Sequence, residues 1–205
     1  MAYISVILMS YLLGSSNMAF YLSKLRKADM RRGSGNLGAS NAVILMGWPA
    51  GVLVGVHDIG KSVLAVLLAQ LAFPDTPCIG AVAGVSSVLG HIFPFYLGFK
   101  GGKGFASYLG MTLALNWKLA LVVLALVVIV TVVFDHIVIG TFTTITVVPI
   151  WSGIASGSAL FALILLIASG VILYKHRENI TRLRSGTEIG LRSTLGKRKT
   201  EAEKP

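Results

Sequence analysis

Long apolar stretches separated by short polar segments form the dominant pattern of this chain. The stretches that we predict to be membrane spans are Tyr3–Leu22, Ala50–Phe73, Ile79–Gly98, Phe105–Leu115, Leu119–Phe134, Thr141–Ile154 and Ala159–Tyr174. A helix perpendicular to the bilayer needs about 20 residues to cross the hydrocarbon, so several of these stretches are short. The pattern predicts an all-α integral membrane protein.

The number of spans depends on the stretch from Phe105 to Phe134, which can form one long helix or two helices broken at Asn116–Lys118. Two helices give seven spans, with the N-terminus outside and the C-terminus cytoplasmic. One helix would place the nine basic residues between Lys175 and Lys204 outside, although short basic segments stay in the cytoplasm. We therefore predict seven spans in one membrane domain, residues 1–180, followed by a basic, partly disordered cytoplasmic tail, residues 181–205.

Composition supports lipid as the solvent of this chain. Of its 205 residues 55% are hydrophobic and only 13% are charged, and the mean hydropathy is +0.79; soluble domains carry about 25% charged residues. The net charge of +10 would also suit nucleic acid, but no soluble domain is predicted that could present a basic face. The first stretch lacks a charged leader and a cleavage site, so we expect a retained span.

Glycine and lysine interrupt the apolar pattern between Phe99 and Phe105, in the sequence Phe-Lys-Gly-Gly-Lys-Gly-Phe. Glycine allows backbone N–H groups to curl around an anion, and lysine supplies the opposite charge. A Walker A loop is excluded, because Gly104 stands where Ser or Thr should follow the lysine. A phosphate site and a flexible basic loop at the lipid headgroups both remain open on this segment alone.

A second polar segment, Gly33–Asn41, contains the spacing Gly-x-Gly-x-x-Gly. A dinucleotide-binding fold is excluded, because a basic run precedes the segment where a buried strand would be required. The side chains of Ser34, Asn36, Ser40 and Asn41 could instead donate and accept hydrogen bonds in a cytoplasmic loop. A solvated loop without a ligand is the alternative.

Three further groups could carry chemistry. Asp58 and Lys61 lie on one helix face within an apolar span, where charges are expensive and are either paired or functional. His91 could be a hydrogen-bonded structural group or a general base. The segment Tyr174–Asn179 closes the last span with more polar functionality than a simple membrane flank needs.

No pair of carboxylates or Cys/His cluster predicts a metal, and Cys78 is the only cysteine. No histidine is followed five residues later by the aspartate of a His-x4-Asp acyltransferase pair.

Taken together, three segments resemble the bacterial acyl-phosphate:glycerol-3-phosphate acyltransferases, the PlsY family. Gly33–Asn41 is similar to the first cytoplasmic loop of that family, Gly-Ser-Gly-Asn-x-Gly-Ala-Thr-Asn. Ser86–Pro94 with Phe99–Gly104 is similar to the second loop, and Tyr174–Asn179 with the residues up to Glu188 is similar to the third. The resemblance covers nearly the whole chain, in the same order.

The resemblance implies an enzyme that moves a fatty acyl group from acyl phosphate to the 1-hydroxyl of glycerol 3-phosphate, giving lysophosphatidate and phosphate, the first acylation of phospholipid synthesis. It implies no cofactor and no nucleic-acid partner. The expected partners are the two substrates, membrane lipid and an upstream enzyme that forms acyl phosphate. The expected location is the bacterial inner membrane, with the active site on the cytoplasmic face.

Residue by residue, the resemblance implies a set of site residues. The catalytic candidates are Lys103, Ser34, Thr141, His176 and Glu178. The candidates for binding substrate or phosphate are Gly35, Asn36, Ser40, Asn41, Asp58, Lys61, His91, Gly101, Gly102, Gly104, Arg177 and Asn179.

The chain also departs from the family pattern. Ile44 stands where family members usually carry an arginine, three residues after the end of the first motif. Val138 and Thr141 replace two serines before the sixth span, and Ser62 replaces a glycine. A non-catalytic paralogue that binds anionic lipid, or one that acts on another phosphorylated alcohol, is the alternative function, and a small transporter is a third.

Overall fold

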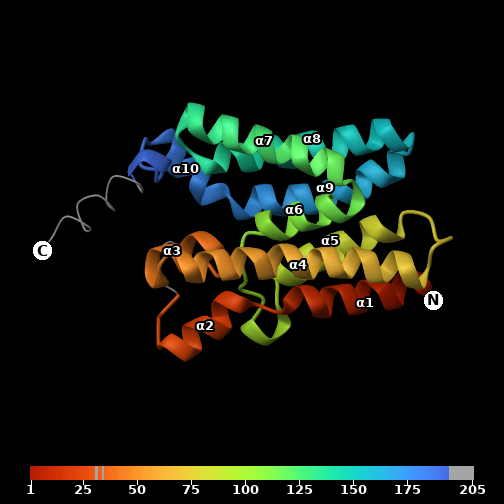
Figure 1. The fold of residues 1–205 in the computed structure, drawn as a ribbon, viewed down its shortest axis with the longest axis horizontal. Helices are drawn as coiled ribbons and strands as arrows, with labels where there is room; N and C mark the ends of the chain where they lie inside the picture. The colour runs from red at the N-terminus through yellow and green to blue at the C-terminus, as the bar shows by residue number, and fades with distance from the viewer. Residues whose placement is uncertain (31, 34, 194–205) are drawn as a thin grey trace, which may run out of the picture.

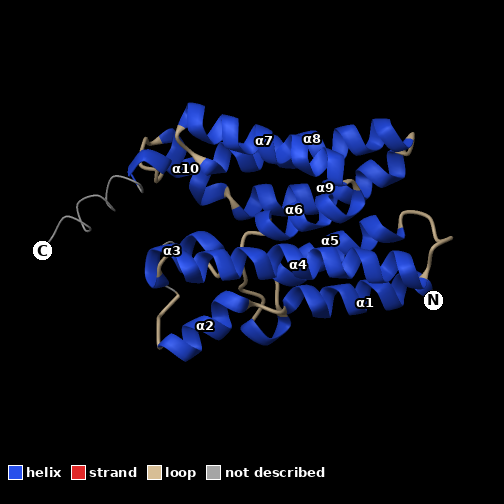
Figure 2. Ribbon diagram, in the orientation of Figure 1, coloured by secondary structure: helices blue, strands red, loops and turns tan. Residues whose placement is uncertain are grey.

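The computed structural model describes residues 1–30, 32–33 and 35–193, and within them the protein is built from helices and connecting loops (Figures 1 and 2). The helices in chain order are α1 Ala2–Ser15, α2 Met18–Arg26, α3 Ala39–Met46, α4 Trp48–Ala72, α5 Ile79–Ile92, the 3₁₀ turn η1 Phe95–Leu97, α6 Phe105–Leu115, α7 Trp117–Phe134, α8 Ile137–Ser156, α9 Ala159–Lys175 and α10 Arg177–Arg184. The prediction of an all-α membrane protein is therefore confirmed in its coarse form.

Five helical segments of the described chain are long and apolar enough to cross a membrane, and the bent pair α9–α10 makes a sixth. The remaining apolar helix, α6, has only 11 residues. The stretch Phe105–Phe134 is divided at Asn116, whose side chain accepts a hydrogen bond from the Leu119 N–H at 3.0 Å and caps α7. Seven passes, with the N-terminus outside and the C-terminus cytoplasmic, stay a prediction.

The predicted span Tyr3–Leu22 is not one continuous helix. It breaks after Ser15, because the Asn17 side chain accepts the Phe20 N–H at 2.9 Å and starts α2 as a separate helix. The break leaves carbonyl groups without helical partners. The Tyr96 hydroxyl donates to the Ser15 carbonyl at 2.9 Å, and the Lys61 ammonium donates to the Ser16 carbonyl at 2.7 Å.

Two other predicted boundaries also differ. The stretch Ile79–Gly98 ends its α-helix at Ile92, since Pro94 follows and disfavours a helical residue before it. The segment between the predicted spans Leu119–Phe134 and Thr141–Ile154, which was expected to be a cytoplasmic loop, is only a tight turn, because α8 begins at Ile137. Asp135 makes the turn in the left-handed conformation, with φ of 65°.

The helices pack side by side in layers, with α7 and α8 against α9 on one side and α4, α5 and α1 on the other (Figure 1). Tyr108 and Met111 of α6 and Leu165 of α9 are fully buried between them. Gly14 and Gly90 lie where α1 and α5 approach so closely that a Cβ would strike the partner backbone. This close packing fixes α5, and with it the loop that follows it.

Candidate active site

A cleft of about 730 Å³ opens at the end of the molecule where α2, α3 and α10 lie. Three connecting segments and the residues beside them form the cleft: the α2–α3 loop, the loop between α5 and α6, and the α9–α10 junction. Its lining residues are Phe20, Ser23, Lys24, Lys27, Ala28, Asp29, Met30, Gly35, Asn36, Leu37, Leu97, Lys100, Gly101, Lys103, Lys175, Arg177 and Glu178. The three predicted polar loops therefore do meet in one place.

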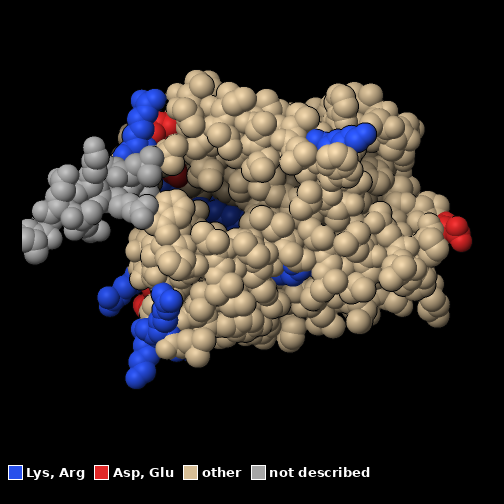
Figure 3. Space-filling view, in the orientation of Figure 1, with Lys and Arg blue, Asp and Glu red and all other residues tan. Residues whose placement is uncertain are grey.

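The cleft is strongly cationic. Six of the described lining residues are Lys or Arg and two are Asp or Glu. Figure 3 shows blue side chains gathered at this end of the molecule, and further blue atoms recessed in a hollow between the helix layers. An excess of positive charge in a recess with low-dielectric walls concentrates anions there, so the cleft is suited to a phosphorylated ligand.

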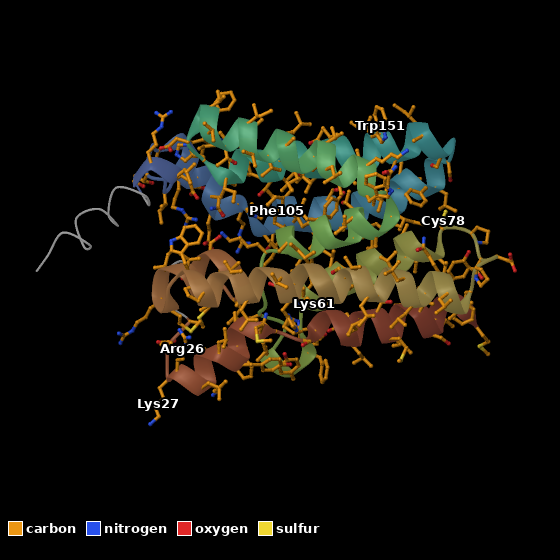
Figure 4. The ribbon with its side chains drawn as sticks, viewed as in Figure 1. Arg26, Lys27, Lys61, Cys78, Phe105 and Trp151 are labelled. Carbon is orange, nitrogen blue, oxygen red and sulfur yellow. The ribbon has the colours of Figure 1, made fainter. Side chains whose placement is uncertain are left out.

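The glycine–lysine loop reaches the cleft from the interior of the molecule. Phe105, the first residue of α6, lies about midway along the long axis in Figure 4, so the loop before it dips inward from the cationic end. The N–H groups of Gly101 and Gly102 donate to the carbonyls of Ile92 and His91, at 3.0 and 3.1 Å. These two N–H groups thus shape the loop by binding α5. Gly104 has φ of 93° and permits the turn into α6.

Lys103 is the residue of the glycine–lysine loop that takes part in the most extensive side-chain hydrogen-bond network. Its ammonium donates to the Asn179 side-chain carbonyl at 2.5 Å, and the Asn179 amide donates to Glu188 Oε1 at 2.7 Å. The second Glu188 oxygen accepts a hydrogen bond from Arg182 at 2.8 Å. Burial and the nearby Arg182 charge lower the pKa of Lys103, whereas the Glu188 and Glu178 carboxylates oppose this change. The loop and α10 are thereby joined at the edge of the cleft.

Asp58, Lys61 and His91 form one buried cluster that does not line the cleft. The Lys61 ammonium lies 3.0 Å from Asp58 Oδ1 and 2.9 Å from His91 Nδ1, in addition to its bond to the Ser16 carbonyl. Lys61 lies midway along the molecule in Figure 4. A Cβ at Gly102 would overlap the His91 ring, so the glycine–lysine loop packs directly against the cluster. Its predicted role in binding phosphate stays a prediction.

The first polar loop contributes Gly35 and Asn36 to the cleft. Asn41 is fully buried, and its amide donates to the Met30 carbonyl at 2.9 Å, which ties α3 to the preceding loop. Ser40 is exposed on α3 and is not among the lining residues. Ser34, one of the catalytic candidates, lies outside the described residues.

The third polar segment contributes Lys175, Arg177 and Glu178. His176 is buried behind them, with Nδ1 2.8 Å from the Ile172 carbonyl. A carbonyl only accepts, so Nδ1 carries the proton and Nε2 holds a lone pair when the ring is neutral. Burial lowers the pKa of His176 to about 4, so the neutral ring is present at pH 7.

Thr141 is also set apart from the cleft lining. It lies one turn inside α8, is 2% exposed, and donates to the Ile137 carbonyl at 3.3 Å. Its position one turn beyond the expected loop follows from the early start of α8.

Several cleft residues were not singled out as site residues by the sequence. Lys24 and Lys27 line the cleft, but in the sequence their positive charge served only to orient the chain. Lys175 also lines the cleft; it belongs to the polar segment Tyr174–Asn179 but was not among the site candidates. The adjacency of these lysines to the polar motifs is the signal that could have found them. Among the described residues no three His, Cys, Asp or Glu side chains gather in a way that could hold a metal ion.

Comparison with known proteins gives a consistent result. The family model described as "Glycerol-3-phosphate acyltransferase" matches residues 4–186. A protein of that name from Prochlorococcus marinus (strain MIT 9215) is 40% identical over 190 residues, which cover 90% of this chain and 95% of that protein. One from Coxiella burnetii (strain RSA 493 / Nine Mile phase I) is 38% identical over 190 residues, which cover 92% of this chain and 97% of that protein.

Two solved structures share the fold. Both are described as PlsY (YgiH), an integral membrane glycerol 3-phosphate acyltransferase. The glycerol 3-phosphate form matches with a TM-score of 0.87 at 31% identity, over 93% of this chain and 96% of that one. The lysophosphatidic acid form matches with a TM-score of 0.85 at 29% identity, over 95% of this chain and 97% of that one. The chain belongs to the glycerol-3-phosphate acyltransferase family.

Proposed function

We propose that the protein transfers a fatty acyl group from acyl phosphate to the 1-hydroxyl of glycerol 3-phosphate and releases lysophosphatidate and inorganic phosphate. One observation carries the proposal: a cleft with six cationic side chains lies at the end of a bundle of apolar helices, in a member of this family. Each substrate carries a phosphate at one end: acyl phosphate at the group that leaves, and glycerol 3-phosphate at the carbon opposite its reacting 1-hydroxyl. The acyl chain can therefore remain among the apolar helices while the charged groups enter the cleft.

The proposed chemistry needs no covalent intermediate on the protein. The hydroxyl oxygen attacks the acyl carbonyl carbon, a new carbon–oxygen ester bond forms, and the bond between that carbon and the phosphate oxygen breaks. The hydroxyl proton is balanced by the released phosphate, which leaves as hydrogen phosphate. Acyl phosphate is an activated donor, so orientation and charge stabilisation can supply much of the reduction in the barrier.

Lys103 is the residue that we assign to charge stabilisation. Its ammonium lines the cleft and is held at one side by Asn179, which leaves its other two N–H groups directed away from that amide. A hydrogen bond from an ammonium to a phosphate oxygen becomes stronger as negative charge develops on the leaving group. Arg177 and the other lysines that line the cleft would hold the phosphate group of the second substrate.

The remaining candidates have orienting or proton-transfer roles in this proposal. Asn36 with Ser34 would orient glycerol 3-phosphate, and Asn41 would keep their loop against α3. Glu178 lines the cleft as a carboxylate, and His176 presents a neutral ring behind it. Either could accept the hydroxyl proton before it reaches the released phosphate.

We further propose that seven passes cross a bacterial inner membrane with the N-terminus outside. The gathering of basic side chains at the cleft end supports a cytoplasmic cleft, since short basic segments remain on that side. A cytoplasmic cleft gives direct access to soluble glycerol 3-phosphate. An upstream enzyme that forms acyl phosphate would then supply the donor from the same side.

Ile44 favours a second candidate, a paralogue that binds another phosphorylated alcohol or only anionic lipid. The side chain is apolar and half-exposed on α3, beside the first loop, where the family usually has a cation. Acceptor choice separates the two functions. Purified protein supplied with acyl phosphate should acylate glycerol 3-phosphate much faster than glycerol, because the cationic cleft would bind only the former. Acylation of a different phosphorylated alcohol alone, or no acyl transfer at all, would favour the second candidate.

A further inference from the structure

The segment that follows α10 folds back over the turn between α7 and α8. We call residues 187–193 the strap. The Leu191 N–H donates to the backbone carbonyl of Asp135 at 2.7 Å, and the Arg192 N–H donates to Asp135 Oδ1 at 2.8 Å. One residue in the turn therefore receives two consecutive backbone N–H groups, through its main chain and its side chain.

Two features show that this contact is specific. Gly190 is buried and lies so close to Asp135 that a Cβ would strike the second carboxylate oxygen. Asp135 itself has positive φ, at 65°, a conformation that non-glycine residues seldom adopt. The guanidinium of Arg192 adds two long contacts, 3.9 Å from Asp135 Oδ1 and 3.5 Å from the Val132 carbonyl. The strap is therefore held mainly through its backbone.

The same strap carries Glu188, two residues before Gly190. The Glu188 side chain is 10% exposed and binds Asn179 through one oxygen and Arg182 through the other. A carboxylate only accepts hydrogen bonds. Glu188 thus requires the Asn179 side chain to present its NH₂ group to the strap and its carbonyl oxygen to the opposite side.

The Lys103 ammonium lies on that opposite side, 2.5 Å from the Asn179 oxygen. If the Asn179 amide turned over, its NH₂ group would face the ammonium and the hydrogen bond would be lost. The orientation of one buried amide therefore links Glu188 to Lys103. Asp135, at the far end of the strap, determines where Glu188 stands.

We propose that Asp135 is a positioning residue for Lys103: it anchors the strap, the strap places Glu188, and Glu188 orients the Asn179 amide that holds the Lys103 ammonium at the cleft. The proposal rests on the proposed role of Lys103 in phosphate binding. Asp135 lies outside the first two polar loops, and it does not line the cleft.

The principal variant is Asp135→Ala, compared with Asp135→Asn, which keeps an oxygen acceptor for the Arg192 N–H. We expect Asp135→Ala to raise the KM for glycerol 3-phosphate or lower kcat by about tenfold, and Asp135→Asn to restore most of that loss. Asp75→Ala is the matched control, because Asp75 is an exposed carboxylate in the turn between α4 and α5 and should leave both constants unchanged. Leu191→Pro removes the other anchoring N–H and gives a second test if Asp135→Ala does not fold.

Two readouts separate positioning from a general loss of stability. In an Asn179→Ala background, Asp135→Ala should cause no further loss, because the amide through which it acts is gone. The pH at which activity falls on the alkaline side should also move. Lys103 faces Arg182 and Lys175, which lower its pKa, and Glu188 and Glu178, which raise it. A displaced Glu188 lowers the pKa of Lys103 further, so the cation, and with it activity, is lost at a lower pH.

The outcomes are distinct for the two proposals. If Lys103→Ala abolishes turnover while Asp135→Ala and Leu191→Pro both retain wild-type constants and the wild-type alkaline limit, the positioning role is wrong and the proposed function stands. Additive losses of Asp135→Ala and Asn179→Ala would also overturn it. If Lys103→Ala retains full turnover, the proposed role of Lys103 fails first.

Discussion

Lys103 differs from the neighbouring Lys100 in having a buried partner that holds its ammonium. Asn179 is 7% exposed, and its oxygen accepts from Lys103 without neutralising the charge. A cation held in a fixed position stabilises the negative charge that develops on phosphate more than a cation on a mobile side chain does, because less reorganisation is needed. At the residue scale we therefore expect the chemistry to depend most on this lysine.

We predict that Lys103→Ala lowers kcat/KM by about 10²- to 10³-fold, the range seen when one preorganised donor is removed. Lys103→Arg keeps the charge but carries a planar fork in place of a compact ammonium, so it should recover only part of the activity. Lys100→Ala is the control at the same loop and should cost less than tenfold. Release of inorganic phosphate measures all three. A Lys103→Ala protein with wild-type kcat/KM would contradict the assignment.

Ile44 leads to a gain-of-function prediction. Its side chain is half-exposed and packs beside Gly33, in the loop that supplies Gly35 and Asn36 to the cleft. Ile44→Arg adds a cation at this edge and should lower the KM for glycerol 3-phosphate about three- to tenfold. Ile44→Met is the uncharged control, for which no change is expected. An unchanged KM for the arginine variant would mean that Lys24 and Lys27 already fill this role.

The motifs in the sequence singled out residues that line the cleft, such as Lys103 and Asn36, but could not place residues whose position depends on where a helix ends. Thr141 was expected at the start of a span and lies one turn inside α8, since the turn at Asp135 is short. Lys175 was expected in a polar segment that could be a membrane flank or part of a site, and it lines the cleft, because α9 and α10 bend at His176. Such distances of one helical turn are decided by tertiary packing.

At the scale of elements, the most consequential feature is the break between α1 and α2. Hydropathy predicted one span there because the three polar residues Ser15, Ser16 and Asn17 hardly change the average over twenty residues. Their hydrogen bonds decide the local structure instead. The break brings the Ser16 carbonyl to Lys61, and Lys61 to His91, on which Gly102 rests. A polar connection thus runs from the first helix to the glycine–lysine loop.

This connection predicts a large effect of Lys61→Met on stability. The variant leaves the Asp58 carboxylate buried without its closest cation and the Ser16 carbonyl without its donor. Breaking a buried ion pair from one side costs about 3 to 5 kcal/mol. Thermal unfolding in detergent should show the loss, and adding Asp58→Asn should recover part of it. Lys118→Met, at an exposed lysine of α7, should change stability by less than about 0.5 kcal/mol. Equal unfolding temperatures for Lys61→Met and wild type would contradict the structural role of the cluster.

At the scale of the whole molecule, charge asymmetry predicts orientation. The basic cleft lies at one end, and Cys78 lies toward the other in Figure 4. In right-side-out membranes, a membrane-impermeant maleimide should label Cys78. In a Cys78→Ser protein carrying Ser185→Cys, whose position follows α10, the same reagent should label only inverted membranes. The reversed pattern would place the cleft outside and exclude the proposed topology.

The order of helices and the meeting of three polar loops could be foreseen from sequence, because each loop interrupts an apolar run and all lie on the same predicted side. The depth of the cleft could not. It depends on the short α6, whose first residue lies well inside the molecule. The hydropathy pattern gave the bounds of α6 but not how far inside the molecule this helix begins. The hydrogen bond from the Arg192 N–H to Asp135 Oδ1, across 57 residues of sequence, leaves no pattern in hydropathy.

The most direct measurement follows both products in one reaction with purified protein in lipid. Acyl phosphate and glycerol 3-phosphate should give lysophosphatidate and inorganic phosphate in a 1:1 ratio, and acyl-CoA should not replace the donor. The Lys103→Ala protein, verified to be folded by its unfolding temperature, should form both products about 10²- to 10³-fold more slowly than wild type. Phosphate release without lysophosphatidate, acylation from acyl-CoA at a comparable rate, or full turnover by Lys103→Ala would contradict the proposed function.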